Sequence, residues 1–159
     1  MKRKLSRMIG VLTALSLSLV LCACGGGSQE AAYTTADAEA LLASGAFDES
    51  MAPVDGDIVT VLYGIDAATV EECVSYLATN TSVSADELTI LVLTDDQAAQ
   101  AALEACQARV ESQIAVCESY APAAVPRLEN AVIRQAGSTV LLAVGDPEIL
   151  PGAVDALHS

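Results

Sequence analysis

The amino-acid sequence predicts a single two-layer α+β domain, in which a small, mostly antiparallel sheet of about three or four strands is covered by a long helix and shorter helices. Residues 87–94, ELTILVLT, form a nearly continuous apolar run, typical of a strand that crosses a core. Residues 95–119 carry an apolar stripe at helical spacing. Residues 130–135 and 138–145 predict a β-hairpin joined through a glycine-containing turn. Because the apolar face of a sheet and the apolar stripe of an amphipathic helix must both be buried, we expect these elements to pack together.

The segment before residue 87 predicts two helices and one ambiguous element. Residues 37–45 predict a short helix, with one of the two preceding threonines as N-cap and Gly45 as C-cap. Residues 58–63 contain β-branched side chains typical of a strand, but they could also form a helix that ends before the next glycine. Residues 66–78 predict a second helix, whose apolar face would carry Val70, Cys73, Val74 and Leu77.

The longest predicted element is the helix over residues 95–119. Thr94 and Gln97 match a capping box that would open it. After the hairpin, Asp146 followed by Pro147 predicts a short final helix, which the next proline shortens or restarts. The predicted buried stripe of the long helix consists of Ala99, Leu103, Cys106, Val110, Ile114 and Cys117.

Three cysteines lie within the predicted domain: Cys73, Cys106 and Cys117. In an exported protein they could form one disulfide and leave one odd thiol, or all three could be small core residues. The helical stripes favour the core. Cys106 and Cys117 would lie about 16 Å apart along one helix, so they cannot pair within it.

The N-terminus has the pattern of a bacterial lipoprotein signal. A basic start precedes an uncharged run from Met8 to Leu21, which is too short for a comfortable membrane span. The segment Leu21-Cys22-Ala23-Cys24 matches a lipobox, with cleavage after Ala23 and lipid attachment at Cys24. Cys22 does not fit as the acylated residue, because Leu21 would have to fill the small site before the cut. An uncleaved anchor or a soluble export signal is the alternative interpretation.

This signal predicts the domain organisation and the location. Residues 1–23 are the signal peptide, residues 24–35 are the lipidated cysteine with a flexible tether, and residues 36–157 are the single domain. Diacylglycerol on Cys24, often with a third chain such as palmitate, would supply the two signals that stable anchoring requires. We therefore expect the protein on the outer face of the cell membrane, extracytoplasmic and lipid-anchored through Cys24.

The charge of the chain excludes some partners. After residue 23 it carries three arginines against 21 acidic residues, a formal net charge of −18. Such a chain repels nucleic-acid phosphates and anionic headgroups, so no nucleic-acid partner is expected. The chain has no Trp and only five other aromatic residues, which removes the usual stacking platforms for sugars and bases.

The sequence contains no recognisable catalytic or metal-binding constellation. The one histidine, His158, lies next to the C-terminal residue and is expected in a frayed tail. Asp55, Asp57 and Asp66 resemble a calcium loop, but Val59 and Thr60 replace a required ligand and a required glycine. We therefore predict no catalytic residue, no metal site and no cofactor. The glutamates at 104, 111 and 118 are about 10.5 Å apart on a helix and predict a solvated face.

Several segments taken together resemble a known family. They are LYGID at 62–66, ADELTILVLTDD at 85–96 before a long helix, and RLENAVIRQAGSTVLLAVGDPE at 127–148, after a lipobox and glycine tether. In this order they resemble the domain-of-unknown-function 4358 family, lipoproteins of Gram-positive bacteria. The resemblance implies a lipid-anchored extracytoplasmic domain. It implies no activity, ligand or catalytic residue.

These observations predict a binding or interaction module rather than an enzyme. The leading hypothesis is a lipid-anchored domain accessory to an envelope or membrane process, with an unidentified protein or envelope partner. One alternative is a solute- or peptide-binding lipoprotein, which a pocket of several hundred Å³ would support. A thiol-dependent enzyme acting through Cys73 is the second alternative, and inert buried thiols would argue against it.

Overall fold

The computed structural model describes residues 32–48 and 50–158, and all statements about structure below concern these residues. The predicted signal peptide, the lipidation site at Cys24 and most of the tether lie outside the described residues. Within the described ranges, no helix combines the length and the apolar character that a membrane span requires.

Five strands form one antiparallel sheet in the order β1-β2-β3-β5-β4. The strands are β1 (Met51–Pro53), β2 (Val70–Ala78), β3 (Glu87–Leu93), β4 (Val132–Ala136) and β5 (Thr139–Val144). β3 lies in the centre between β2 and β5, and the side chains of β3 and β5 are buried on both faces of the sheet. This explains their nearly continuous apolar sequences.

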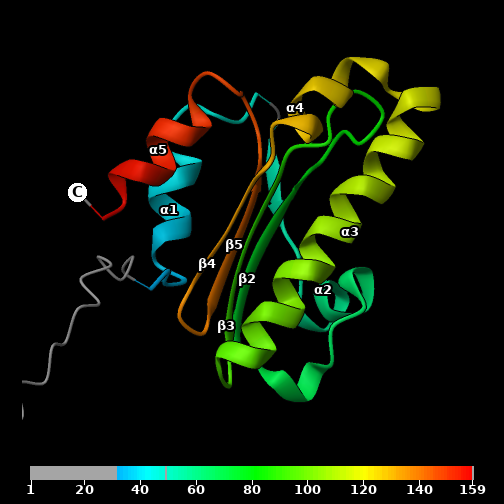
Figure 1. Ribbon diagram of the computed structural model, residues 1–159. Coiled ribbons are helices and arrows are strands. Elements are labelled where there is room, and N and C mark those ends of the chain that lie inside the picture. The colour runs from blue at the N-terminus through cyan, green and yellow to red at the C-terminus, as the bar shows by residue number, and fades with distance from the viewer. Residues whose placement is uncertain (1–31, 49, 159) are drawn as a thin grey trace, which may run out of the picture.

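Helices cover both faces of the sheet (Figure 1). On one face lie α2 (Gly56–Tyr63), the long α3 (Asp96–Tyr120) and α4 (Val125–Glu129), with short 3-10 turns η1 (Ala67–Thr69) and η2 (Pro122–Ala124) beside them. On the other face lie α1 (Asp37–Leu42) and α5 (Leu150–Ala156). The predicted α+β class, the antiparallel sheet and the long covering helix are confirmed. The sheet has five strands instead of the expected three or four, and its second face carries a helical layer of its own.

The alternation of side chains along β3 divides the core into two halves. Leu88 and Ile90 face α1 and α5. Leu91 and Leu93 face α3, and so does Glu87, which contacts a side chain of that helix. Successive side chains of a strand point to opposite faces, so a single strand supplies both cores and one buried acid.

The predicted helix over residues 66–78 is wrong, because residues 70–78 form strand β2. Apolar side chains lie on both sides of this strand: Cys73 packs in the α3 core, whereas Val74 packs in the α1 core. The positions 70, 73, 74 and 77 suit a helix, but β2 pairs with β1 on one side and β3 on the other. These pairings satisfy the backbone groups of a segment whose branched and aromatic residues favour a strand.

The ambiguous residues 58–63 belong to helix α2. Asp55 caps this helix, because its side chain accepts a hydrogen bond from the Asp57 backbone amide at 3.1 Å. Gly64 ends the helix in the left-handed conformation, with φ 69°. These two local signals outweigh the weak preference of Ile, Val and Thr for strands.

The caps and first residues of the other helices differ slightly from the predicted ones. α3 is capped by Asp95 instead of Thr94, and the Asp95 side chain accepts from the Ala98 amide. α1 has no threonine cap; instead Thr34 donates to the carboxylate of Asp37. α5 begins at Leu150 with the following proline in its first turn, so the helix restarts there rather than at Asp146. Side chains one residue apart offer the same capping groups, and tertiary packing chooses between them.

Candidate functional site

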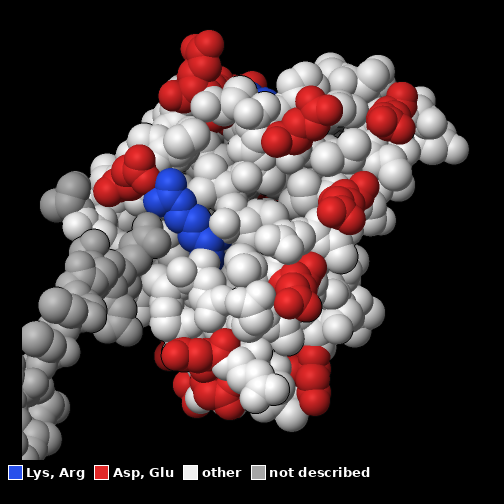
Figure 2. All heavy atoms as spheres, in the orientation of Figure 1, with Lys and Arg blue, Asp and Glu red and all other residues white. Residues whose placement is uncertain are grey.

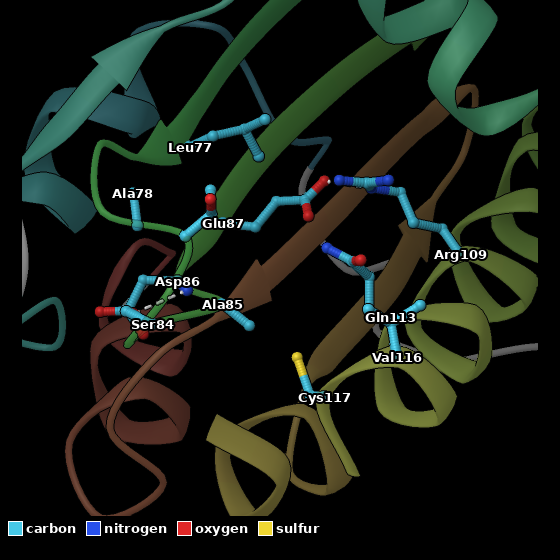
Figure 3. Close-up of a pocket in the computed structure, with 11 residues that line it drawn as sticks. Leu77, Ala78, Ser84, Ala85, Asp86, Glu87, Arg109, Gln113, Val116 and Cys117 are labelled. Atoms are coloured by element: carbon cyan, nitrogen blue, oxygen red, sulfur yellow. Dashed lines mark hydrogen bonds and ion pairs between the residues drawn. The ribbon is translucent and has the colours of Figure 1, made fainter. Parts of the chain in front are cut away.

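A cavity of about 260 Å³ opens at one end of the sheet, between α3 and the connection from β2 to β3 (Figure 3). Its walls come from the end of β2, the loop over residues 79–86, the first residue of β3 and the second half of α3. Its apolar walls include Leu77, Ala85, Val116 and Cys117, and its polar groups include Glu87, Arg109 and Gln113. Small-molecule pockets typically have volumes from about 300 Å³ upward, so this one suits a small ligand.

A buried ion pair lies at the inner end of the cavity. Arg109 donates from Nε to Glu87 Oε1 at 2.7 Å, and the Glu87 side chain is only 2% exposed. The Tyr63 hydroxyl donates to the same oxygen, and it also contacts Thr89 Oγ1 at 2.7 Å. Thr89 Oγ1 in turn lies 2.7 Å from Ser75 Oγ. A charge so completely buried requires such partners, and this network supplies them.

The network fixes the protonation states of Tyr63 and Arg109. Burial raises the pKa of Tyr63 well above its usual value, and the neighbouring Glu87 charge raises it further, so Tyr63 stays a neutral donor. Burial alone would lower the pKa of Arg109. The hydrogen bond and charge of Glu87 outweigh this effect and raise that pKa, so Arg109 stays cationic.

A second ion pair stabilises the wall of the cavity. Arg127 on α4 donates from Nη1 to both carboxylate oxygens of the fully buried Asp86, at 2.7 and 2.8 Å, and from Nη2 to Asp48. Asp86 also accepts from the Asp48 backbone amide at 3.1 Å, and its own amide donates to Ser84. Arg127 therefore ties α4 and the segment after α1 to the residues just before Glu87.

Each of the arginines in the described part of the chain has an acidic partner. The third pair joins Arg134 to Asp155, 2.7 Å apart, between β4 and α5. The other acidic side chains of the described residues are distributed over the surface, and Figure 2 shows acidic groups spread across one face with few basic groups among them. The surface field is consequently negative, as the sequence predicts, and a soluble anion would approach it against repulsion.

The cysteines within the described ranges are free thiols. Cys106 and Cys117 lie on the buried face of α3, as predicted, and burial raises the pKa of Cys106 to about 12. Cys73 is half-buried on β2, where burial and then Asp55 raise its pKa to about 11. A thiol nucleophile needs a lowered pKa, so Cys73 has the opposite environment.

The other residues considered from the sequence do not form a site. His158 lies against the ring of Tyr33, with centroids 5.2 Å apart, beside the core on the other face of the sheet. Within residues 32–48 and 50–158, no group of three or more His, Cys, Asp or Glu side chains is arranged to hold a metal ion. The glutamates at 104, 111 and 118 on α3 are exposed, as predicted.

Sequence reasoning did not find Glu87, Arg109 and Gln113. One usable signal was the rarity of cations, because Arg109 is one of three arginines after residue 23 and lies beside an apolar helical stripe. A second signal was Glu87 at the head of an otherwise apolar strand. Arg109, Gln113 and Val116 also follow the i, i+4, i+7 spacing of one helical face. The pairing itself joins residues 22 positions apart, and only the fold brings them together.

Residues 43–145 match the family described as Domain of unknown function (DUF4358). The chain belongs to this family. The match covers β1 to β5, so it includes the cavity and both ion pairs around it. No curated protein matches this DUF4358 chain, and no solved structure matches it either. The description of the family names neither an activity nor a ligand.

Proposed function

We propose that this DUF4358 protein is a lipid-anchored extracytoplasmic binding module, accessory to an envelope or membrane process, whose ligand or partner occupies the cavity beside Glu87 and Arg109. The anchor is supported by the lipobox at residues 21–24. One observation carries the binding role: a cavity of about 260 Å³ is lined by an ionised pair at its inner end and by apolar side chains around it. A few convergent polar groups in an otherwise apolar pocket are typical of ligand sites.

The edge of the cavity also favours binding. Val116 lines it and is 50% exposed, and Val83 in the adjoining loop is 52% exposed. Tyr120, at the end of the same helix, is 83% exposed. Large apolar side chains in water near a partly polar cavity are an arrangement that a bound partner would cover.

The alternative of a solute- or peptide-binding lipoprotein gains support from the same cavity. Its volume fits a single amino-acid-sized group better than a long peptide. A thiol-dependent enzyme acting through Cys73 gains none, because the pKa of that thiol is raised to about 11 and Cys73 does not line the cavity.

Site-specific photocrosslinking in intact cells tests the binding role. A benzophenone amino acid placed at Thr81, which is exposed and lines the cavity, should form one defined adduct. The matched control places the same group at Gln107, an exposed position of α3 outside the cavity. Equal adducts from both positions, or none from Thr81, would refute the binding of a cellular partner at this cavity.

Metabolic labelling with a fatty-acid probe tests the anchor separately. Cys24→Ala should abolish the label and release the protein from the membrane fraction. Cys22→Ala, two residues away, should leave both unchanged, since this cysteine is removed with the signal peptide. A label that survives Cys24→Ala would disprove the proposed lipid attachment.

A further inference from the structure

The ion pair beside the cavity leaves hydrogen-bonding capacity unused, and this capacity defines the ligand. Glu87 Oε1 accepts from both Tyr63 and Arg109. Glu87 Oε2, in contrast, accepts no hydrogen bond from any residue in the described part of the chain. The Glu87 side chain is 98% buried, yet it lines the cavity. Glu87 Oε2 is not among the sealed polar atoms that lack a partner in the described residues, so it is open to the cavity, where a ligand N–H group can donate to it.

Arg109 and Gln113 supply complementary donors on the facing helix. A guanidinium carries five N–H groups, and the one on Nε of Arg109 is used by Glu87. Figure 3 shows Arg109 and Gln113, one helical turn apart on α3, both pointing toward the Glu87 carboxylate across the cavity. A ligand lying beside the ion pair would therefore meet an acceptor, Glu87 Oε2, on the strand side and the remaining donors of Arg109 and Gln113 on the helix side.

The charges around the cavity select against ions. Glu87 and Arg109 neutralise each other, and Asp86 is neutralised by Arg127. An anionic ligand would be repelled by a chain whose formal charge after residue 23 is −18. A cationic ligand is attracted by the same net charge, but in the cavity it would lie beside the Arg109 guanidinium, whose repulsion opposes that attraction. A neutral group that offers one donor and one acceptor fits both sides.

We propose that the cavity binds a neutral peptide group carrying a small aliphatic side chain, with its N–H group on Glu87 Oε2 and its carbonyl oxygen on the donors of Arg109 and Gln113. Leu77, Ala85 and Val116 supply the apolar walls for the side chain. The cavity volume of about 260 Å³ limits the buried part to about one residue. This assignment rests on the proposed binding function and specifies its ligand class.

Three probes that differ mainly in charge test the assignment. N-acetyl-leucinamide is neutral, N-acetyl-leucine is an anion and leucinamide is a cation at pH 7. Their dissociation constants are measured by ligand-observed NMR on the full chain purified in detergent. We expect the neutral probe to bind at least about tenfold more tightly than either ion, because only the neutral probe avoids unfavourable charge contacts. Equal or tighter binding of a charged probe would overturn the assignment, as would no binding of the neutral probe up to its solubility limit.

Two cavity-filling variants locate the binding. Gln113→Trp should weaken binding of the neutral probe at least about tenfold by occupying the cavity. Gln107→Trp, on an exposed part of the same helix, should leave it unchanged. If Gln113→Trp fails to fold, as judged by circular dichroism, Thr81→Trp fills the cavity from the opposite wall. Binding that survives both cavity variants would place the probe elsewhere and overturn the assignment.

The two tests fail independently. A defined photocrosslink from Thr81 without binding of the neutral probe would reject the ligand class and keep the binding role. Binding of the neutral probe at the cavity without any photocrosslink from Thr81 would keep the ligand class and reject a partner in cells.

Discussion

Replacing Arg109 with methionine should destabilise the domain strongly, because it removes the partner of a buried charge. Methionine nearly matches the length of the arginine stem but cannot neutralise Glu87, whose side chain is 2% exposed. Breaking a buried pair in this way costs about 3–5 kcal/mol of unfolding free energy. Tyr63 would still donate to Glu87, and Arg109 is itself 12% exposed. We therefore expect the lower end, about 3 kcal/mol.

Urea denaturation of the full chain, followed by far-UV circular dichroism, measures this loss. The matched control is Arg134→Met, which removes the same side chain from its pair with Asp155, a residue that is 65% exposed. Because exposed ion pairs contribute little, this control should lose about 1 kcal/mol or less. A similar loss for both variants would show that the Glu87–Arg109 pair is not the buried, charged contact described above.

A double-mutant cycle separates the ion pair from simple loss of packing. Glu87→Gln keeps an oxygen for the Tyr63 hydroxyl but removes the charge. Once residue 87 is neutral, Arg109→Met leaves no isolated charge behind, so the second substitution should cost far less. We expect a coupling free energy of about 2 kcal/mol or more between the two positions. Additive losses would refute the reasoning.

Three further predictions concern the thiols and the glycines. Iodoacetamide at pH 8 should alkylate Cys73 about 100-fold more slowly in the folded protein than in urea. The reason is that only the thiolate reacts, and folding raises the pKa of Cys73 from 9.0 to about 11. Mass spectrometry measures the two rates, and equal rates would contradict the raised pKa. Gly145→Ala should lose about 1–3 kcal/mol of unfolding free energy, since its Cβ would lie 2.7 Å from the carbonyl oxygen of Ala46. Gly152→Ala in α5 should gain about 0.5–1 kcal/mol, because its Cβ meets no atom within 4 Å. Urea denaturation that ranks the two variants in the opposite order would refute this. Folding raises the pKa of Cys106 from 9.0 to about 12, so the contribution of its neutral thiol to stability is complete below pH 9 and is lost as the pH rises toward 12. The melting temperature should therefore fall less steeply over this pH window in Cys106→Ala than in the unsubstituted protein. The same slope in both proteins would contradict this prediction.

The elements that sequence reasoning predicted well are those in which the local pattern allows one solution. α3 shows this, because an apolar side chain recurs every three or four residues from Ala99 to Cys117 and no strand could bury that stripe. The β4–β5 hairpin is similar, since Gly137 supplies the positive φ that its tight turn requires. Residues 70–78 show the opposite case. Their spacing suits a helix and a strand equally, and the edges of β1 and β3 decided between them.

The candidate site was not predictable in the same way. Glu87 and Arg109 each carry only a weak signal in the sequence, since Glu87 opens an apolar strand and Arg109 is one of three arginines after residue 23. Their pairing depends on which face of β3 turns toward α3 and on the rotation of α3 about its own axis. The cavity between them depends further on Arg127, which holds the adjoining loop in place from a separate helix.

The sequence by itself determined the properties that add along the chain: the charge, the lipobox pattern at Cys24, the long helix, the central strand and the family resemblance. Each is a sum or a periodicity over neighbouring residues, so no contact between distant segments is needed to read it. The tertiary structure alone decided the fifth strand, the helical layer on the second face, the buried Glu87–Arg109 pair and the cavity beside it. These depend on which distant surfaces bury each other, and that choice is made by the packing of the whole domain.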